Sequence, residues 1–333
     1  MNTPVDGVRV PARDIPFPRS ISAEAQAALR RLVNADGVPF NALHTPPHPD
    51  DFDGWMRFKA AADAQYGAAM AQYAGQLRSS VETLRIGDAT VHIATPADPL
   101  ADDVVYVDLH GGGLVFGGGD VCRIGAQMQA DQLGVRCWGI DYRMPPVHPY
   151  PAALDDCLAV YRRLLNDYAS SRIVVGGRSA GANLAAAMVL RARDEGLALP
   201  AALVLLSPEV DLTESGDSFE LNQRVDVLLP RSLMSNNLLY AAGADLADPY
   251  LSPLFGDFTQ GFVPTFIQSG TRDLFLSNAV RMHRALRRAQ VACELHVFEA
   301  MPHGGFMGAP EDRELRAEVA RFVHEHWRAG RRN

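Results

Sequence analysis

The chain has 333 residues, which is long enough for one large domain with a substantial buried core, or for one domain with an appended lid. Hydrophobic residues make up 47% of it and charged residues 21%, proportions that are ordinary for a soluble globular protein. With 31 basic and 39 acidic side chains the formal net charge is −8, which argues against a nucleic-acid partner or an anionic membrane surface.

The cysteines and the N-terminal segment indicate the cellular compartment of the protein. The four cysteines form no C-x-x-C pair and three of them lie in apolar runs, so we expect buried, reduced thiols. Residues 1–20 contain no apolar core of a signal peptide, and no stretch of 18 apolar residues occurs in the chain. These features predict a cytoplasmic protein that does not insert into a membrane.

The N-terminal part reads as irregular chain followed by two helices. Residues 1–20 show no periodic pattern. A serine can cap a helix over about 22–34, and an aspartate can cap a second helix over about 51–75, each with apolar residues at helical spacing. We interpret residues 1–80 as an N-terminal helical cap segment.

From residue 81 onward, short β-type runs alternate with helical segments, which is typical of βαβ units and a mostly parallel sheet. The expected strands cover residues 81–86, 90–94, 104–109, 136–141, 173–175, 203–206, 265–269 and 294–298. The expected helices cover residues 121–133, 152–166, 182–195, 277–289 and 311–328. The pattern predicts an α/β fold: a mostly parallel eight-stranded sheet with helices on both faces and a helical cap.

One interval interrupts this alternation. Residues 212–262 contain one helical piece, about 230–242, among loop signals such as Asp248-Pro249. We interpret the interval as an insertion that, with the N-terminal helices, covers the carboxyl edge of the sheet. The predicted organisation is a cap segment over residues 1–80 and a main domain over residues 81–333, which carries the insertion.

The most informative chemical signal is a serine between two glycines. Residues 177–181 read Gly-Arg-Ser-Ala-Gly, after an apolar strand and before a helical run. A strand, a tight glycine turn and a helix in this order are what a nucleophile elbow needs, because bulky neighbours would collide in the strained turn. Ser179 would then stand at the carboxyl end of a strand, next to the positive end of a helix dipole.

A second glycine cluster follows the third expected strand. Residues 110–113 read His-Gly-Gly-Gly, and three glycines let a backbone turn its amides toward a ligand. In acyl transfer such a loop builds an oxyanion hole, here from the amides of Gly112, Gly113 and Ala180. The alternatives are a flexible loop and a phosphate cradle, although neither a dinucleotide-binding nor a Walker-type glycine motif is present. We interpret His110 as a structural anchor of the loop.

Four motifs in this order resemble the hormone-sensitive-lipase-like branch of the α/β-hydrolase carboxylesterases. They are the glycine cluster at 110–113, Asp-Tyr-Arg-Met-Pro-Pro-Val-His-Pro-Tyr-Pro-Ala-Ala at 141–153, Ser-Ala-Gly-Ala-Asn-Leu-Ala at 179–185, and Ser207-Pro208 with Asp-Leu-Thr at 211–213. The resemblance covers about residues 81–330. It implies an esterase or lipase-like hydrolase of short or medium acyl esters, with a Ser-Asp-His triad, no cofactor and a helical cap.

The partners of Ser179 follow from the chain order of this fold, which is serine, then acid, then histidine. His303 lies in a loop after the last strand, from where its imidazole can serve as base and then as acid. Asp273 follows the penultimate strand in a Gly-x-x-Asp pattern and can orient the imidazole. Glu209 and Asp211 also lie near a strand end and stay open as rivals for the acid.

The sequence departs from the family pattern at three positions. Arg178 stands where an aspartate is usual before the nucleophile, Val147 where a glutamate is usual, and Glu209 where an aromatic residue is common. Because an unpaired buried arginine would be costly, we expect Arg178 to pair with Glu209. The alternative is that Arg178 points to solvent.

The predicted reaction is hydrolysis of a small-molecule carboxylic ester through an acyl-enzyme. Apolar residues near the glycine loop or in the insertion are candidates to line the substrate pocket: Phe116, Leu228, Leu229 and Phe255. An amidase or formamidase with the same triad, and a non-catalytic binding protein on the same scaffold, stay open. No metal site is expected, because His44 and His48 lack carboxylate or cysteine partners at ligand spacing. The last strand and helix are a candidate surface for a homodimer.

Overall fold

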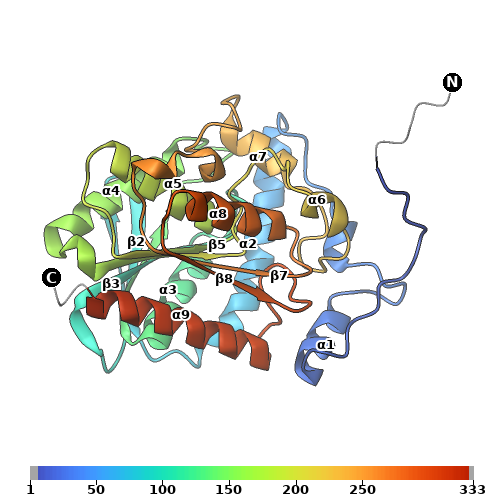
Figure 1. Ribbon diagram of the computed structural model, residues 1–333, viewed down its shortest axis with the longest axis horizontal. Coiled ribbons are helices and arrows are strands. Elements are labelled where there is room, and N and C mark those ends of the chain that lie inside the picture. Colours follow the sequence, from blue (N-terminus) through green and yellow to red (C-terminus); the bar gives the residue numbers. More distant parts are fainter. Residues whose placement is uncertain (1–6, 330–333) are drawn as a thin grey trace.

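The computed structural model describes residues 7–329, which form one sheet covered by helices on both faces (Figure 1). In this range eight strands lie in the order β1-β2-β4-β3-β5-β6-β7-β8. Their bounds are β1 Ser80–Ile86, β2 Ala89–Thr95, β3 Ala101–Leu109, β4 Val135–Asp141, β5 Ile173–Arg178, β6 Ala202–Leu206, β7 Thr265–Gly270 and β8 Cys293–Phe298. β2 pairs antiparallel with both β1 and β4, whereas β3 to β8 run parallel. The expected mostly parallel, eight-stranded sheet is confirmed.

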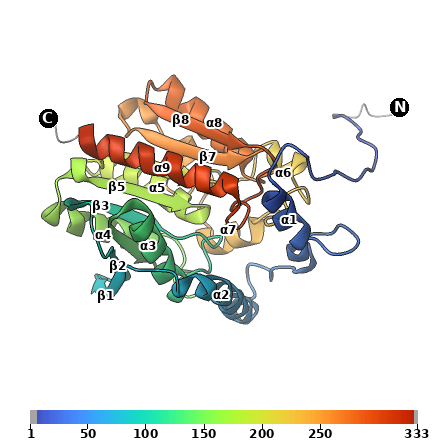
Figure 2. The ribbon, with the colours of Figure 1, turned by 90° about the horizontal axis from the view of Figure 1, so that it is seen from below.

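Helices cover both faces of the sheet and one of its ends. On one face lie α3 (Asp120–Leu133) and α9 (Pro310–Ala329), and on the other lie α4 (Ala152–Asp167), α5 (Ala180–Asp194) and α8 (Leu276–Arg288). Figure 2 shows four further helices gathered toward the carboxyl ends of the parallel strands: α1 (Ala23–Arg31), α2 (Phe52–Ala74), α6 (Ser218–Leu221) and α7 (Met234–Ala241).

Two apolar layers fill the space between the sheet and the helices on its faces. Along β3 the side chains alternate between these layers: Val105, Val107 and Leu109 join the one that contains α4, α5 and α8, while Val104 and Tyr106 join the one that contains α3 and α9. All five are at most 2% exposed, as expected for a central parallel strand that is covered on both sides. The layers make the sheet a rigid platform for the loops at its edge.

The observed elements follow the sequence pattern closely, with differences in β3, β5, α5, α6 and α7. β3 begins at Ala101 rather than at residue 104, and β5 ends at Arg178 rather than at residue 175. α5 begins at Ala180 rather than at residue 182, directly after the serine turn. α7 is shorter than the predicted helix over 230–242, and α6 was not predicted because four residues are too few to show a helical period. The chain is irregular over residues 7–20 as predicted, and residues 1–6 lie outside the described residues.

Two expectations from composition can also be compared with the structure. The four cysteines are free, with Cys122, Cys137 and Cys157 buried and Cys293 half-buried, which agrees with the reduced thiols predicted. Within residues 7–329, no helix combines the length and the apolar character that crossing a bilayer requires.

The N-terminal helix supports the loop between β8 and α9. Ser22, the N-cap of α1, donates from its backbone amide and its hydroxyl to the carboxylate of Glu311, at 2.7 and 2.8 Å. The apolar side of α1 packs with Met301 and Phe306 of that loop. This loop contains His303, so the N-terminal segment helps to hold one of the predicted site residues.

Candidate active site

Ser179 occupies the sharp turn between β5 and α5. Its backbone has φ 57° and ψ −124°, a conformation that is strained for a residue with a side chain. Its amide donates to the carbonyl of Leu206 in neighbouring β6 at 2.9 Å, which ties the turn to the sheet. The residue is only 6% exposed. The serine therefore sits at the start of a helix, in the geometry of a nucleophile elbow.

Close backbone contacts explain the glycines around this turn. A Cβ on Gly181 would lie 1.9 Å from the carbonyl oxygen of Leu109 at the end of β3, and a Cβ on Gly177 would lie 2.3 Å from the carbonyl oxygen of Gly181. Real Cβ atoms do not approach other atoms this closely. A Cβ on Gly111 would lie 3.1 Å from the carbonyl oxygen of Arg178, so the glycine loop after β3 runs directly beside the elbow.

The glycine loop is folded back on itself. Gly112 (φ 132°) and Gly113 (φ 54°) have backbone angles that favour glycine. The carbonyl of Gly112 accepts hydrogen bonds from the amides of Val115 and Phe116, both at 3.0 Å. In the described part of the chain, no hydrogen bond has the amide of Gly112, Gly113 or Ala180 as its donor. The three amides predicted for the oxyanion hole are thus donors without an acceptor in residues 7–329.

Two helices from outside the sheet layers hold the loop. Asp63 of α2 accepts a hydrogen bond from the amide of Gly117 at 2.7 Å, and Asn236 of α7 donates to the carbonyl of Gly113 at 3.2 Å. Asn236 is 2% exposed, so this bond is shielded from water. Neither contact could be read from the sequence, because each joins segments that are far apart in the chain.

His110 is buried at the start of the same loop. Its Nδ1 donates to the carbonyl of Gly111 at 2.8 Å, and its ring stacks on Tyr142 with the centroids 4.1 Å apart. The hydroxyl of Tyr142 donates to the carbonyl of His110 at 2.7 Å. Burial lowers the pKa of His110, which keeps the ring neutral. These contacts agree with the structural role predicted for this histidine.

His303 and Asp273 meet at the carboxyl edge of the sheet. Nδ1 of His303 lies 3.1 Å from Oδ1 of Asp273, which is fully buried. The Asp273 carboxylate also accepts from the Phe275 amide and the Ser269 hydroxyl, each at 2.9 Å. Burial alone would raise the pKa of Asp273, but the charge and hydrogen bond of His303, with the Phe275 amide, outweigh it and hold the pKa below its usual value. Asp273 is therefore an anion that orients the imidazole and leaves its Nε2 free.

The serine lies on the same edge of the sheet as this pair. Ser179 follows β5, and the loops of Asp273 and His303 follow β7 and β8 in the strand order β5-β6-β7-β8. Because these strands are parallel, their carboxyl ends meet at one edge. Among the described residues, the hydroxyl of Ser179 makes no hydrogen bond to His303, so the structure joins the acid and the histidine directly but not the serine. Such a bond commonly tightens only when substrate is bound.

Known proteins resemble this chain in sequence. The profile of a family described as having the alpha/beta hydrolase fold matches residues 106–307. An esterase of Acinetobacter venetianus is 31% identical over 221 residues, which cover 65% of this chain and 73% of that protein. An acetyl-hydrolase of Streptomyces hygroscopicus is 33% identical over 224 residues, which cover 67% of this chain and 74% of that protein.

Solved structures agree with these relatives. The crystal structure of an esterase matches with a TM-score of 0.89 and 35% identity, over 96% of this chain and 99% of that one. An esterase from the bacterial hormone-sensitive lipase family matches with a TM-score of 0.78 and 29% identity, over 92% and 99% of the two chains. This chain belongs to the hormone-sensitive-lipase-like family of α/β-hydrolase carboxylesterases. It is a carboxylic ester hydrolase, and the alternative of a non-catalytic binding protein is set aside.

The ion pair predicted between Arg178 and Glu209 is wrong for this esterase. Neither carboxylate oxygen of Glu209 has a hydrogen-bond partner in residues 7–329, and Glu209 is 1% exposed. Burial, together with nearby Glu214, raises the pKa of Glu209 well above its usual value, so burial favours the neutral form of this carboxyl. The charge of Arg178 acts instead on Asp108, whose pKa burial raises to about 6 against the lowering effect of the arginine.

Three of the predicted pocket residues lie beside the site. Phe116 belongs to the glycine loop and is half-buried. A Cβ on Gly304, the residue after His303, would lie 3.7 Å from the Leu228 side chain. Leu229 packs against the cluster of Phe219, Leu274 and Phe275. The ring of Phe275 contacts the imidazole of His303 edge-on, with the centroids 4.9 Å apart.

The fourth predicted pocket residue, Phe255, lies elsewhere. It ends the short 3-10 helix Pro253–Phe255, which packs on α5 and α8, and it is 39% exposed. The next residue, Gly256, contacts Leu190, about three turns along α5 from the serine. Sequence reasoning missed Leu233 instead, whose side chain would lie 3.5 Å from a Cβ on Gly113. Only tertiary packing reveals that contact.

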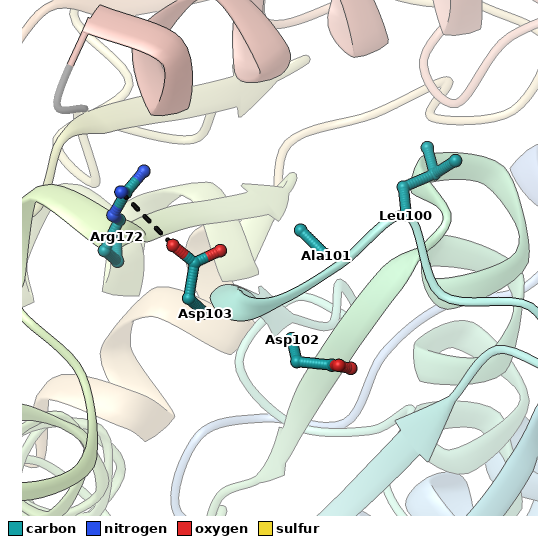
Figure 3. Close-up of a pocket in the computed structure, with 5 residues that line it drawn as sticks. All are labelled: Leu100, Ala101, Asp102, Asp103 and Arg172. Carbon is teal, nitrogen blue, oxygen red and sulfur yellow. Dashed lines mark ion pairs between the residues drawn. The ribbon is translucent and has the colours of Figure 1, made fainter. Parts of the chain in front are cut away.

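A surface depression lies at the opposite end of the strands (Figure 3). It is lined by residues 100–103, around the start of β3, and by Arg172, which precedes β5 and pairs with Asp103 at 3.2 Å. Ser179 follows β5, so the length of that strand separates this depression from the candidate active site.

A methyl group added at Gly181 tests the close contact between β3 and α5. Gly181→Ala pushes β3 and α5 apart at the Leu109 carbonyl, so we expect it to lower the free energy of unfolding by about 3 kcal/mol. The control is Gly67→Ala in α2, where no atom lies within 4 Å of the new Cβ; it should be neutral or stabilise by about 0.5–1 kcal/mol. Urea unfolding measures both variants, and equal stability of the two would contradict the close contact.

Proposed function

We propose that Ser179, His303 and Asp273 are the catalytic triad of a serine esterase. The observation that carries this proposal is the buried His303–Asp273 pair, at 3.1 Å, on the edge of the sheet where Ser179 is held in a strained turn. An anion bound to Nδ1 selects the tautomer with a free Nε2 and stabilises the imidazolium that forms when the serine proton is transferred.

The proposed reaction has two halves. Ser179 Oγ attacks the ester carbonyl carbon while His303 Nε2 takes its proton, and a tetrahedral oxyanion forms. The oxyanion collapses, the alcohol leaves with the proton from His303, and the acyl group stays on Ser179. A water molecule then loses a proton to His303 and attacks the acyl-enzyme. The carboxylic acid leaves as His303 returns the proton to Ser179 Oγ. Asp273 stays ionised throughout and keeps accepting the hydrogen bond from Nδ1–H of His303.

The proposed oxyanion hole consists of the amides of Gly112, Gly113 and Ala180. Their lack of partners in the described chain supports this role, because donors that are already bonded could not receive the new charge. The helix that begins at Ala180 adds the positive end of its dipole. Asn236 and Asp63 fix the loop from either side, so the donors need not reorganise when the oxyanion forms.

We further infer that residues 1–80 and the insertion over 212–262 form a cap on the catalytic domain over 81–333. The contacts of α2 and α7 with the glycine loop support this division. Half-buried Phe116, Leu228 and Leu229 would offer an apolar surface to the acyl chain. The acetyl-hydrolase among the relatives supports a small acyl group, so we propose short- to medium-chain esters as substrates.

The cellular location and the oligomeric state of the enzyme stay predictions. A cytoplasmic location rests on the composition of the N-terminal segment alone. A homodimer through the last strand and helix rests on the position of β8 at the edge of the sheet, where Val297 is 42% exposed.

Removing the nucleophile tests the mechanism directly. We expect Ser179→Ala to lower kcat by about 10⁴–10⁶-fold while the protein still folds, because the rest of the site remains in place. A fluorophosphonate probe should label the wild type and not the variant. Near wild-type ester turnover by a correctly folded Ser179→Ala enzyme would rule the mechanism out.

Substitutions of two buried aspartates test which residue is the acid of the proposed triad. We expect Asp273→Asn to lower kcat by about 10⁴-fold, because the amide favours the wrong imidazole tautomer. The matched control is Asp211→Asn: Asp211 is equally buried, but it binds Thr213, Ser215 and Arg281 rather than a histidine. The control should lose stability and keep its kcat. The reverse result in steady-state assays would make Asp211 the acid.

A panel of p-nitrophenyl esters, from acetate to palmitate, measures the acyl preference. We expect kcat/KM to be highest for short and medium chains and to fall for long ones, because residues 7–329 show no obvious large amphipathic lid of the kind that interfacial lipase action needs. The matching p-nitroanilides should be turned over far more slowly. Faster turnover of the anilides than of the esters would favour the amidase alternative.

A further inference from the structure

A second buried carboxylate lies behind the proposed triad. Asp226 is fully buried, in the irregular segment between α6 and α7. It belongs to the insertion, and the mechanism above does not use it. A buried carboxylate is costly unless strong hydrogen bonds compensate it, so its partners show what it stabilises.

Asp226 accepts four backbone hydrogen bonds from three segments. Oδ1 accepts from the amides of Leu228 at 2.9 Å and Leu229 at 3.0 Å, which closes a local turn. Oδ2 accepts from the amide of Leu274 at 2.9 Å and from the amide of His303 at 3.0 Å. A local turn needs only the first pair. The second pair joins the residue after Asp273 to the backbone of His303.

The charged groups that face Asp226 are those of the proposed triad. Asp273 comes from the loop after β7, and His303 comes from the loop after β8. Burial, and secondarily the charge of Asp273, raise the pKa of Asp226 to about 6, while the charge of His303 and the backbone donors act in the opposite direction. Asp226 is therefore mostly ionised at neutral pH, and the imidazole lies near two carboxylates.

We propose that Asp226 is a positioning residue that fixes the His303 backbone against the loop of Asp273 and adds a second negative charge near the imidazolium. This inference rests on the proposed function. It assigns the insertion a part in the chemistry as well as in covering the site. A shift of about 1 Å in a catalytic group can cost about 10²-fold in rate, so a bond that sets the position of His303 affects kcat.

The chain offers a matched control in Asp312. Its carboxylate also accepts backbone amides of the loop between β8 and α9, from Phe306 at 2.9 Å, Gly308 at 2.6 Å and Ala309 at 3.1 Å. Asp312 is 8% exposed and forms no bond to His303 or Leu274 in the described chain. It holds the same loop without touching the proposed triad, so it reports the effect of loosening the loop alone.

The experiment compares Asp226→Asn, Asp226→Glu and Asp312→Asn in the full-length enzyme, with p-nitrophenyl acetate. In Asp226→Asn an amide group faces backbone donors and the charge is lost, so we expect kcat to fall by about 10²-fold with little change in KM. The acid limb of kcat/KM should move down by about one pH unit, because protonating the imidazole becomes less favourable and the Asp226 titration is gone. Asp312→Asn should unfold at a lower temperature with its acid limb unmoved.

Asp226→Glu keeps the charge but displaces it. We expect a reduced kcat with the acid limb at its wild-type position, and this variant carries the test if Asp226→Asn does not fold. A wild-type kcat in both Asp226 variants, or equal shifts of the acid limb in Asp226→Asn and Asp312→Asn, would overturn the proposal. If Ser179→Ala also stays active, the proposed function fails; if Ser179→Ala is inactive, only the role of Asp226 fails.

Discussion

The close approach between the end of β3 and the start of α5 is the constraint on which the site depends. Leu109 and Gly181 can pack backbone to backbone only because Gly181 has no side chain. That contact places the glycine loop, which continues from β3, next to the turn that continues from β5. This arrangement supports the proposal that the amides of Gly112 and Ala180, which donate no backbone hydrogen bond in the described chain, act together with Ser179. The strain of Ser179 persists because the strand, the helix and the loop all hold the turn in place.

In addition to this contact, aspartate carboxylates accept hydrogen bonds from the loops at the carboxyl edge of the sheet. Loop amides have no strand partner, and each must find another acceptor when it is buried. Four aspartates supply such acceptors: Asp63 to Gly117, Asp141 to Gly119, Asp226 to Leu274 and His303, and Asp312 to Phe306. Bonds to a charged acceptor are stronger than those between neutral groups, so irregular backbone gains rigidity. An active site built on loops thereby becomes preorganised.

The difference between local features and contacts across the chain explains how much of the fold and of the site the sequence could predict. The strands, the serine turn and the places of Asp273 and His303 follow from local period, from glycine stereochemistry and from the chain order of the fold, all of which are visible in a linear sequence. The contacts of Asp226 with His303 and of Asn236 with Gly113 are not visible in the sequence, because the paired residues lie 77 and 123 positions apart in the chain. The predicted Arg178–Glu209 ion pair was wrong for the same reason: the burial that raises the pKa of Glu209 comes from packing between distant segments. Phe255 was predicted to line the substrate pocket because it lies in the insertion. Its position in the sequence does not indicate which face of α5 it covers.

The raised pKa of buried Glu209 bears on the electrostatics of the site. Glu209 follows β6, and its amide donates to the carbonyl of Ser179 at 3.3 Å, so its backbone lies beside the serine turn. Burial favours the neutral form of its carboxyl, and the charge of Arg178 opposes the effect of burial on the pKa of Asp108. The imidazole side of the site, in contrast, contains the two buried carboxylates Asp273 and Asp226. In the transition state of the proposed mechanism, the oxyanion and the imidazolium develop together. Placing the carboxylates on the imidazolium side stabilises one charge without opposing the other.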